Sequence, residues 1–157
     1  MLWLLLYFTL VVAALAMALG WVTLGLRRVR RAERTKAKAL EAFRHGADLA
    51  ETFRAAAEAT GKPRGLSWKR CELAAAPPLI AVDKATGELV ALVGVTIAFE
   101  AVAGGGMEEV EAVSALRDAT AVFHWREGRW QTEGRAVFNH SPEQTLERYR
   151  HHLAPGH

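Results

Sequence analysis

The sequence predicts an α+β fold, in which a helical N-terminal part is followed by an antiparallel sheet and a short C-terminal helix. Three observations support this expectation. Residues 1–26 carry no charged side chain. Apolar residues between 29 and 60 recur every three or four positions, as on one face of a helix. From residue 66 the period changes to the alternation that is typical of strands. Residues 39–157 are long enough for one ordinary soluble domain and too short for two.

The first 26 residues predict a transmembrane helix that remains attached as an anchor. From Leu2 to Leu26 such a helix rises about 36 Å, enough to cross a hydrocarbon core of about 30 Å. Trp3 and Trp21 would then lie near the two interfaces. A cleaved secretory signal is the alternative, with small residues at 14–18 as the cleavage site. Its apolar core would be only about 7–15 residues long and would follow a basic segment.

Residues 27–38 form a basic juxtamembrane segment with a net charge of +6, which leaves −3 for the residues that follow. Its first cations are Arg27, Arg28, Arg30 and Arg31. Arginines next to a span are retained on the cytoplasmic side, so we expect a single-pass protein of the cell (inner) membrane with its N-terminus out and its domain in the cytoplasm. The same arginines, with Trp3 and Trp21, would contact the lipid bilayer. No nucleic-acid partner is expected, because the folded part carries no positive excess.

A long amphipathic helix is predicted over residues 29–60. Its apolar stripe consists of Leu40, Phe43, Ala47, Ala50, Phe53 and Ala57. Gly61 and Pro63 provide the stop signal. Because the stripe is rich in alanine, the helix is expected to lie closely on the sheet. The sequence leaves open whether this helix is continuous with the membrane helix.

An antiparallel sheet of about five strands is predicted after the helix. The expected strands are residues 66–73, 79–82, 88–103, 118–126 and 129–139. Asp83 and Gly87 favour a hairpin turn between the second and third strands. The face of the third strand that begins with Leu89 is uniformly apolar and is expected to meet the helix. Residues 107–115 are ambiguous, because glutamates interrupt their apolar alternation.

The last two strands are expected to form a hairpin across the two-residue turn at 127–128. In this register the facing pairs on one side are Trp125 with Trp130, Phe123 with Thr132, and Ala121 with Gly134. On the other side they are His124 with Gln131, Val122 with Glu133, and Thr120 with Arg135. The register therefore brings His124, Glu133 and Arg135 to one face, opposite the aromatic pair.

A capping box marks the start of the C-terminal helix, because Ser141 is followed by Pro142 and then by Gln144. The packed side of this helix is expected to consist of Leu146, Tyr149 and Leu153. A helix followed by a meandering sheet is the order of an α+β roll, in which a curled sheet wraps a helix. Cystatin-like and nuclear-transport-factor-like domains are similar to this order by architecture only, and the resemblance implies no function.

Motifs for catalysis and for metal binding are missing from the sequence. It contains no zinc-protease helix motif, Walker loop, nucleophile elbow or dinucleotide-binding glycine motif. His151 and His152 are adjacent, so on a helix they point in different directions, and with His157 they form a poor metal site. No cofactor and no metal are therefore expected. Cys71, the sole cysteine, is expected to be a small buried hydrophobe, with a nucleophilic role as the alternative.

The one candidate site is the group His124, Glu133 and Arg135. A histidine beside a carboxylate in a concave mouth could act as a general base. The alternative is that this face is simply solvated. We therefore expect a non-enzymatic membrane-anchored protein whose domain binds a protein partner or forms a homo-oligomer. The competing hypothesis is a small-ligand-binding or enzymatic domain, which an apolar cavity of several hundred cubic ångströms at these residues would favour.

Overall fold

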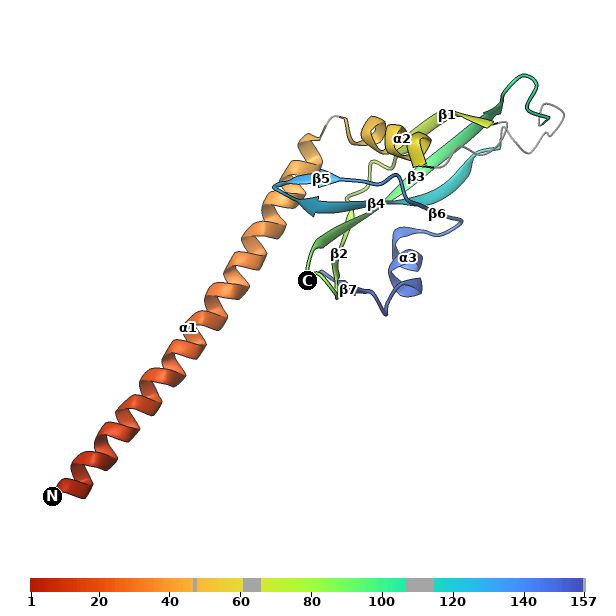
Figure 1. Ribbon diagram of the computed structural model, residues 1–157. Coiled ribbons are helices and arrows are strands. Elements are labelled where there is room, and N and C mark those ends of the chain that lie inside the picture. The colour runs from red at the N-terminus through yellow and green to blue at the C-terminus, as the bar shows by residue number, and fades with distance from the viewer. Residues whose placement is uncertain (47, 61–65, 107–114, 157) are drawn as a thin grey trace. The chain divides into compact units, whose positions relative to one another are not determined.

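The computed structural model describes residues 1–46, 48–60, 66–106 and 115–156, except for the side chains at 2, 4–6, 9, 11, 12 and 14. The chain divides into two compact units, Met1–Lys38 and Ala39–His157. The elements belong to an α+β fold with a long N-terminal helix, an open antiparallel sheet and a short C-terminal helix. Figure 1 labels these elements along the chain.

Helix α1 is 44 residues long and spans Leu2–His45, so the apolar segment, the basic segment and the start of the amphipathic segment are continuous. Many large apolar side chains of this helix are exposed. They include Trp3, Tyr7, Phe8, Leu10, Leu15, Met17, Leu19, Trp21, Val22, Leu24, Leu26 and Val29. Among the residues that the structure describes, none of the helices combines the length and the apolar character required for a membrane span.

The amphipathic helix predicted over 29–60 is interrupted in its middle. Helix α1 ends at His45, and α2 runs from Leu49 to Thr60. Gly46 lies at the break, where a Cβ atom would come within 2.9 Å of the Leu49 side chain. Glycine is a poor helix former, and here it also permits the close approach of the next helix.

The described strands form one seven-stranded antiparallel sheet, organised around the long strand β3. Their bounds are Leu66–Leu73 (β1), Leu79–Asp83 (β2), Leu89–Ala101 (β3), Arg117–Arg126 (β4), Arg129–Gln131 (β5), Ala136–Phe138 (β6) and Leu153–Pro155 (β7). Strand β3 pairs with β4 on one edge and with β1 and β2 on the other; β5 and β6 pair with β4, and β7 pairs with β2. The prediction of about five strands is too low, because the last predicted strand is two short strands and the C-terminus adds another.

Different helices cover the two faces of this sheet, and Figure 1 shows α2 and α3 on opposite sides. On one face, alternate residues of β3 from Ala91 to Phe99 pack with the last turns of α1 and with α2, as predicted. Trp130 of β5 joins this core, and its Nε1 donates a hydrogen bond to the carbonyl of Ala39 (2.8 Å). On the other face, Val90 and Leu92 pack with residues around α3.

The predicted hairpin of β4 with the following strand is confirmed near its turn and wrong beyond it. Trp125 pairs with Trp130, and their ring centroids are 5.2 Å apart. Ala121, however, pairs with Ala136 instead of Gly134. The register therefore shifts by two residues between β5, which ends at Gln131, and β6.

Two tertiary contacts accompany this shift. The Thr132 hydroxyl donates to the carbonyl of Val122 (2.8 Å), which takes the place of a backbone ladder bond. Gly134 has a φ of +74°, and a Cβ atom there would lie 2.2 Å from the amide nitrogen of Ala57 on α2. Only glycine fits so close to the helix backbone in that conformation. Residues 132–135 therefore lie between β5 and β6 and belong to neither strand.

Helix α3 spans Pro142–Arg148 and begins at the predicted capping box. The Gln144 amide donates to Ser141 Oγ, and the Ser141 amide donates to Gln144 Oε1. The helix is shorter than predicted, because Leu153 belongs to β7 and pairs with Asp83 of β2. The ambiguous segment at 107–115 lies outside the described residues except for its last position, and it stays a prediction.

Candidate functional site

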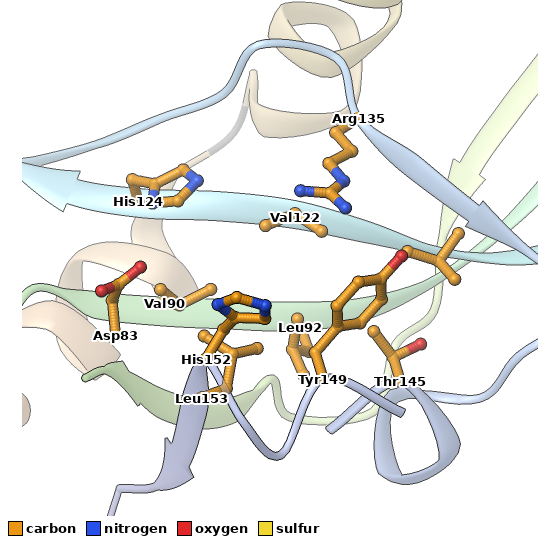
Figure 2. Close-up of a pocket in the computed structure, with 11 residues that line it drawn as sticks. Asp83, Val90, Leu92, Val122, His124, Arg135, Thr145, Tyr149, His152 and Leu153 are labelled. Atoms are coloured by element: carbon orange, nitrogen blue, oxygen red, sulfur yellow. The ribbon is translucent and has the colours of Figure 1, made fainter. Parts of the chain in front are cut away.

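A cavity of about 300 Å³ lies on the face of the sheet that α3 covers in part. Figure 2 shows its lining side chains, which come from β2, β3, β4, β6, α3 and the residues around them. They are Asp83, Val90, Leu92, Val122, His124, Arg135, Val137, Thr145, Tyr149, His152 and Leu153. This volume is at the lower end of the range of about 300–1,000 Å³ for small-molecule sites.

The floor of the cavity is apolar because Val90 and Leu92 of β3 and Val122 of β4 face it. Val90 and Leu92 alternate along β3 with the residues that face α2, and both are buried. Val122 of β4 pairs directly with Leu92 and continues the floor. Helix α3 is only seven residues long, so it covers just part of this surface.

Arg135 and Tyr149 meet at one side of the cavity. The Arg135 Cζ lies 5.1 Å from the centroid of the Tyr149 ring, which is a cation–π contact. The Arg135 guanidinium beside the Tyr149 hydroxyl lowers the pKa of that hydroxyl, and Arg148 lowers it further. Arg135 is exposed, and among the described residues it forms no ion pair with a carboxylate.

Two buried polar atoms at the cavity have no hydrogen-bond partner among the described residues. They are Thr145 Oγ1 and His124 Nδ1. Thr145 is 1% exposed, so its hydroxyl is also shielded from bulk water. Leaving such a group unpaired costs about 1–3 kcal/mol, and native proteins rarely do so without a reason. Both residues line the cavity, but these two atoms are themselves fully buried, so a molecule in the cavity reaches them only after a small movement of the side chains.

Asp83 and His152 line a further part of the cavity. The Asp83 Oδ1 accepts hydrogen bonds from the amides of Ala85 (2.8 Å) and Thr86 (3.0 Å) within the predicted turn. These backbone donors, Thr86 first, hold the pKa of the Asp83 carboxyl below its usual value. His152 is exposed at the rim, and in the view of Figure 2 its ring lies between Asp83 and Tyr149.

The structure brings together two of the three predicted site residues. His124 and Arg135 both line the cavity, whereas Glu133 does not. The Glu133 side chain is 77% exposed, and its nearest cation is Arg126 at 3.9 Å. The carboxylate nearest to His124 is that of Glu88, 3.9 Å from Nδ1. His124 pairs with Gln131 as predicted, but the expected proximity of Glu133 to His124 is not found, because the register shift leaves Glu133 between β5 and β6.

Sequence reasoning missed Thr145 and Tyr149 as site residues. Tyr149 was expected only to pack against the sheet. The sequence did indicate that these two residues lie together, because the capping box sets the start of α3 and residues four positions apart share one helical face. The sequence could not reveal which face would border a cavity, since that depends on β7 and its pairing with β2.

Cys71 lies on β1 and packs with the other core, on the α2 face of the sheet. Burial raises the pKa of its thiol to about 11. Little thiolate therefore exists near neutral pH, and the structure does not favour a nucleophilic role. Within the described ranges, no three His, Cys, Asp or Glu side chains are grouped in a way that could hold a metal ion.

The residues predicted to contact the membrane all lie on α1, and all are exposed. They are Trp3, Trp21, Arg27, Arg28, Arg30 and Arg31. Trp3 is 84% exposed and Trp21 is 80% exposed.

Fold and site together define an α+β domain with an open antiparallel sheet and a ligand-sized cavity beside its C-terminal helix. Comparison of the chain with protein family models, with curated proteins and with solved structures gives no match. The functional argument therefore rests on the geometry of the cavity and on the sequence.

Proposed function

We propose that the unit Ala39–His157 binds a small molecule in the cavity between the sheet and α3. One observation carries the proposal: polar groups without partners converge on an apolar floor. The Thr145 hydroxyl and His124 Nδ1 lack a hydrogen-bond partner among the described residues, and the Arg135 guanidinium at the same cavity contacts Tyr149 but no carboxylate of the described part. An apolar pocket with a few placed polar groups is the usual form of a small-molecule site. A bound ligand would also supply the hydrogen bonds that the buried groups lack.

The arrangement favours binding over catalysis. A nucleophile and its base require a hydrogen-bond distance of about 2.6–3.2 Å. His124 Nδ1 is 3.9 Å from Glu88 Oε2, and Cys71 lies on the opposite face of the sheet. We therefore propose a binding protein, and an enzyme built around His124 stays the competing hypothesis.

A compound screen against the full-length chain in a mild detergent tests this proposal. Ligands of the cavity are expected to raise the melting temperature, because they bind only the folded state. Val122→Phe fills the cavity from its floor and should abolish the shift. Val102→Phe introduces the same ring at an exposed position and should preserve it.

Two results would contradict ligand binding in the cavity. One is a screen without any ligand, and the other is a ligand that binds the folded Val122→Phe variant as tightly as the original chain. If Val122→Phe does not fold, Val137→Leu narrows the same cavity at a lower packing cost and should weaken binding.

We also propose that residues 1–26 anchor the chain in the cell inner membrane, with the domain in the cytoplasm. The support is the length of the uncharged segment, the large exposed apolar side chains of α1 and the arginines that follow from Arg27. Reporters that are active on one side only, fused to the C-terminus, should give the cytoplasmic signal. An extracytoplasmic signal would reverse the orientation. Release of the chain by alkaline carbonate would exclude the anchor.

Association with a protein partner or with a second copy stays a prediction from the sequence. Crosslinking in intact membranes tests it, because a homo-oligomer gives crosslinked species at multiples of the chain mass. A matched sample without residues 1–26 separates association through the domain from association through the helix. Absence of any crosslinked species in both samples would contradict the prediction.

A further inference from the structure

We propose that the ligand of this cavity is a small monoanionic organic acid, whose carboxylate is bound by Arg135 and Tyr149 and whose apolar part covers the floor of Val90, Leu92 and Val122. The inference rests on the proposed function, since it names the chemical class of a ligand that the cavity is proposed to bind. Three properties of the cavity lead to it: a cation, hydroxyl groups on the same side, and a limit on negative charge.

Arg135 is the cation of the cavity, and it has no carboxylate partner among the described residues. Its guanidinium presents a planar fork of N–H donors that matches a carboxylate, and charge-assisted bonds of this kind are the strongest in proteins. Within the described part of the chain it stands over the Tyr149 ring and forms no ion pair. Arg126 and Arg129, at the turn between β4 and β5, instead form ion pairs with glutamates. Arg135 therefore remains available for an anion that enters the cavity.

Two hydroxyl groups complete the same side of the cavity. Tyr149 follows Thr145 by four positions, so both side chains project from one side of the α3 segment. The Thr145 hydroxyl is buried and lacks a partner among the described residues. The Tyr149 hydroxyl can donate to a carboxylate oxygen, and the Thr145 hydroxyl can do so once its side chain rotates toward the ligand. In the view of Figure 2, Arg135, Tyr149 and Thr145 lie toward one end of the cavity, and Asp83 lies toward the other.

Asp83 limits the charge and the orientation of the ligand. Its carboxylate is stabilised by two backbone amides, so it stays negative near neutral pH. Among the lining residues one aspartate thus opposes one arginine. A single negative charge placed beside Arg135, away from Asp83, is favourable, whereas a phosphate monoester with about −1.5 to −2 charges brings a second charge that no further arginine of the described lining matches. The apolar floor then takes the uncharged part of the ligand.

A pair of probes of equal shape tests the proposed class. The full-length chain in detergent is titrated with phenylpropionate and with the neutral phenylpropanamide, and binding is followed by NMR shifts of the floor residues. We expect the acid to bind about tenfold more tightly, which corresponds to a hydrogen bond to a charged group. Arg135→Gln should bring the ratio of the two affinities close to one. Arg129→Gln, which removes an exposed arginine outside the cavity, should leave the ratio unchanged.

Thr145→Val provides a second test that is independent of net charge. Valine has nearly the same shape but no hydroxyl, so affinity for the acid should fall several-fold. The folded state should not be weakened, because the hydroxyl has no hydrogen bond to lose. An unchanged affinity in the folded Thr145→Val variant would remove Thr145 from the site and contradict the proposed geometry.

The outcomes separate this inference from the proposed function. If the amide binds as tightly as the acid, or if only neutral or cationic compounds from the screen bind, the acid class is wrong and the cavity remains a ligand site. If phenylethyl phosphate binds more tightly than phenylpropionate, the limit to one negative charge is wrong. If no compound of any class binds, the proposed function itself is wrong.

Discussion

The two faces of the sheet are built from the same strands and differ in what covers them. On the α2 face, Phe43 contacts both Phe123 and Trp130 at centroid distances of 5.9 Å, and Phe53 lies 6.0 Å from Phe123. On the α3 face, the floor consists of smaller aliphatic residues beside polar groups without partners. The comparison teaches that large aromatic side chains pack the α2 face, while the smaller residues of the α3 face leave the larger of the two cavities.

The difference follows from the size of the covering elements. Helix α2 has twelve residues and acts together with the last turns of α1, whereas α3 has seven. The α2 face also has a cavity, of about 180 Å³ near Trp68, but it is smaller than the one beside α3. Because α3 is short, it leaves space above Val90, Leu92 and Val122 that side chains of moderate size do not fill.

The largest expected effect is on the α2 face. Phe53→Ala removes a fully buried ring and should lower the free energy of unfolding by about 3–5 kcal/mol. Denaturant unfolding of the full-length chain measures the loss. Binding in the cavity should persist in the fraction that is folded. A loss below about 1 kcal/mol would show that the aromatic cluster is not the main core.

A somewhat smaller loss is expected where the sheet meets α2 most closely. Gly134→Ala places a Cβ atom 2.2 Å from the Ala57 nitrogen at a φ of +74° and should cost at least about 2 kcal/mol. Gly128→Ala is the matched control, since its φ is +77° but nothing lies within 4 Å of the new atom. It should cost only about 1 kcal/mol. Equal losses in the two variants would contradict the close contact with α2.

Two buried threonines should respond in opposite directions. Thr145→Val removes a hydroxyl without a partner and should raise the free energy of unfolding by up to about 1 kcal/mol. Thr120→Val should lower it by about 1–2 kcal/mol, because the Thr120 hydroxyl donates to the carbonyl of His140 at 2.8 Å. Thermal unfolding of both variants without ligand provides the measurement. Destabilisation by Thr145→Val would mean that its hydroxyl is paired in solution.

The smallest expected effect concerns the pH dependence of stability at Asp83. The folded state lowers the pKa of this carboxyl, so its contribution to stability is present above about pH 4 and is lost as the pH falls through the folded value. Asp83→Asn keeps an oxygen acceptor for the turn but has no charge. The stability difference between the two chains should therefore shrink on acidification below about pH 4. A difference that is constant from pH 7 to pH 3 would contradict this.

Local signals predicted much of the fold because their causes are local. The capping box at Ser141 and Gln144 and the turn from Asp83 to Gly87 depend on residues within one or two turns of each other. The alternation of β3 predicted which of its faces meets the helix. The break at Gly46 was missed, because an isolated glycine interrupts a helix only when the following segment packs differently.

By itself the sequence determined the class of fold, the order of its elements and the face on which His124 and Arg135 lie. These follow from periodicity and from short-range hydrogen bonds. The tertiary structure alone decided which other residues line the cavity with His124 and Arg135. The contact of Gly134 with Ala57 shifts the register and excludes Glu133, and the pairing of β7 with β2 places the α3 segment, with Thr145, beside the floor. Contacts between residues so distant in the chain leave no periodic trace in the sequence, because their energy depends on packing in three dimensions.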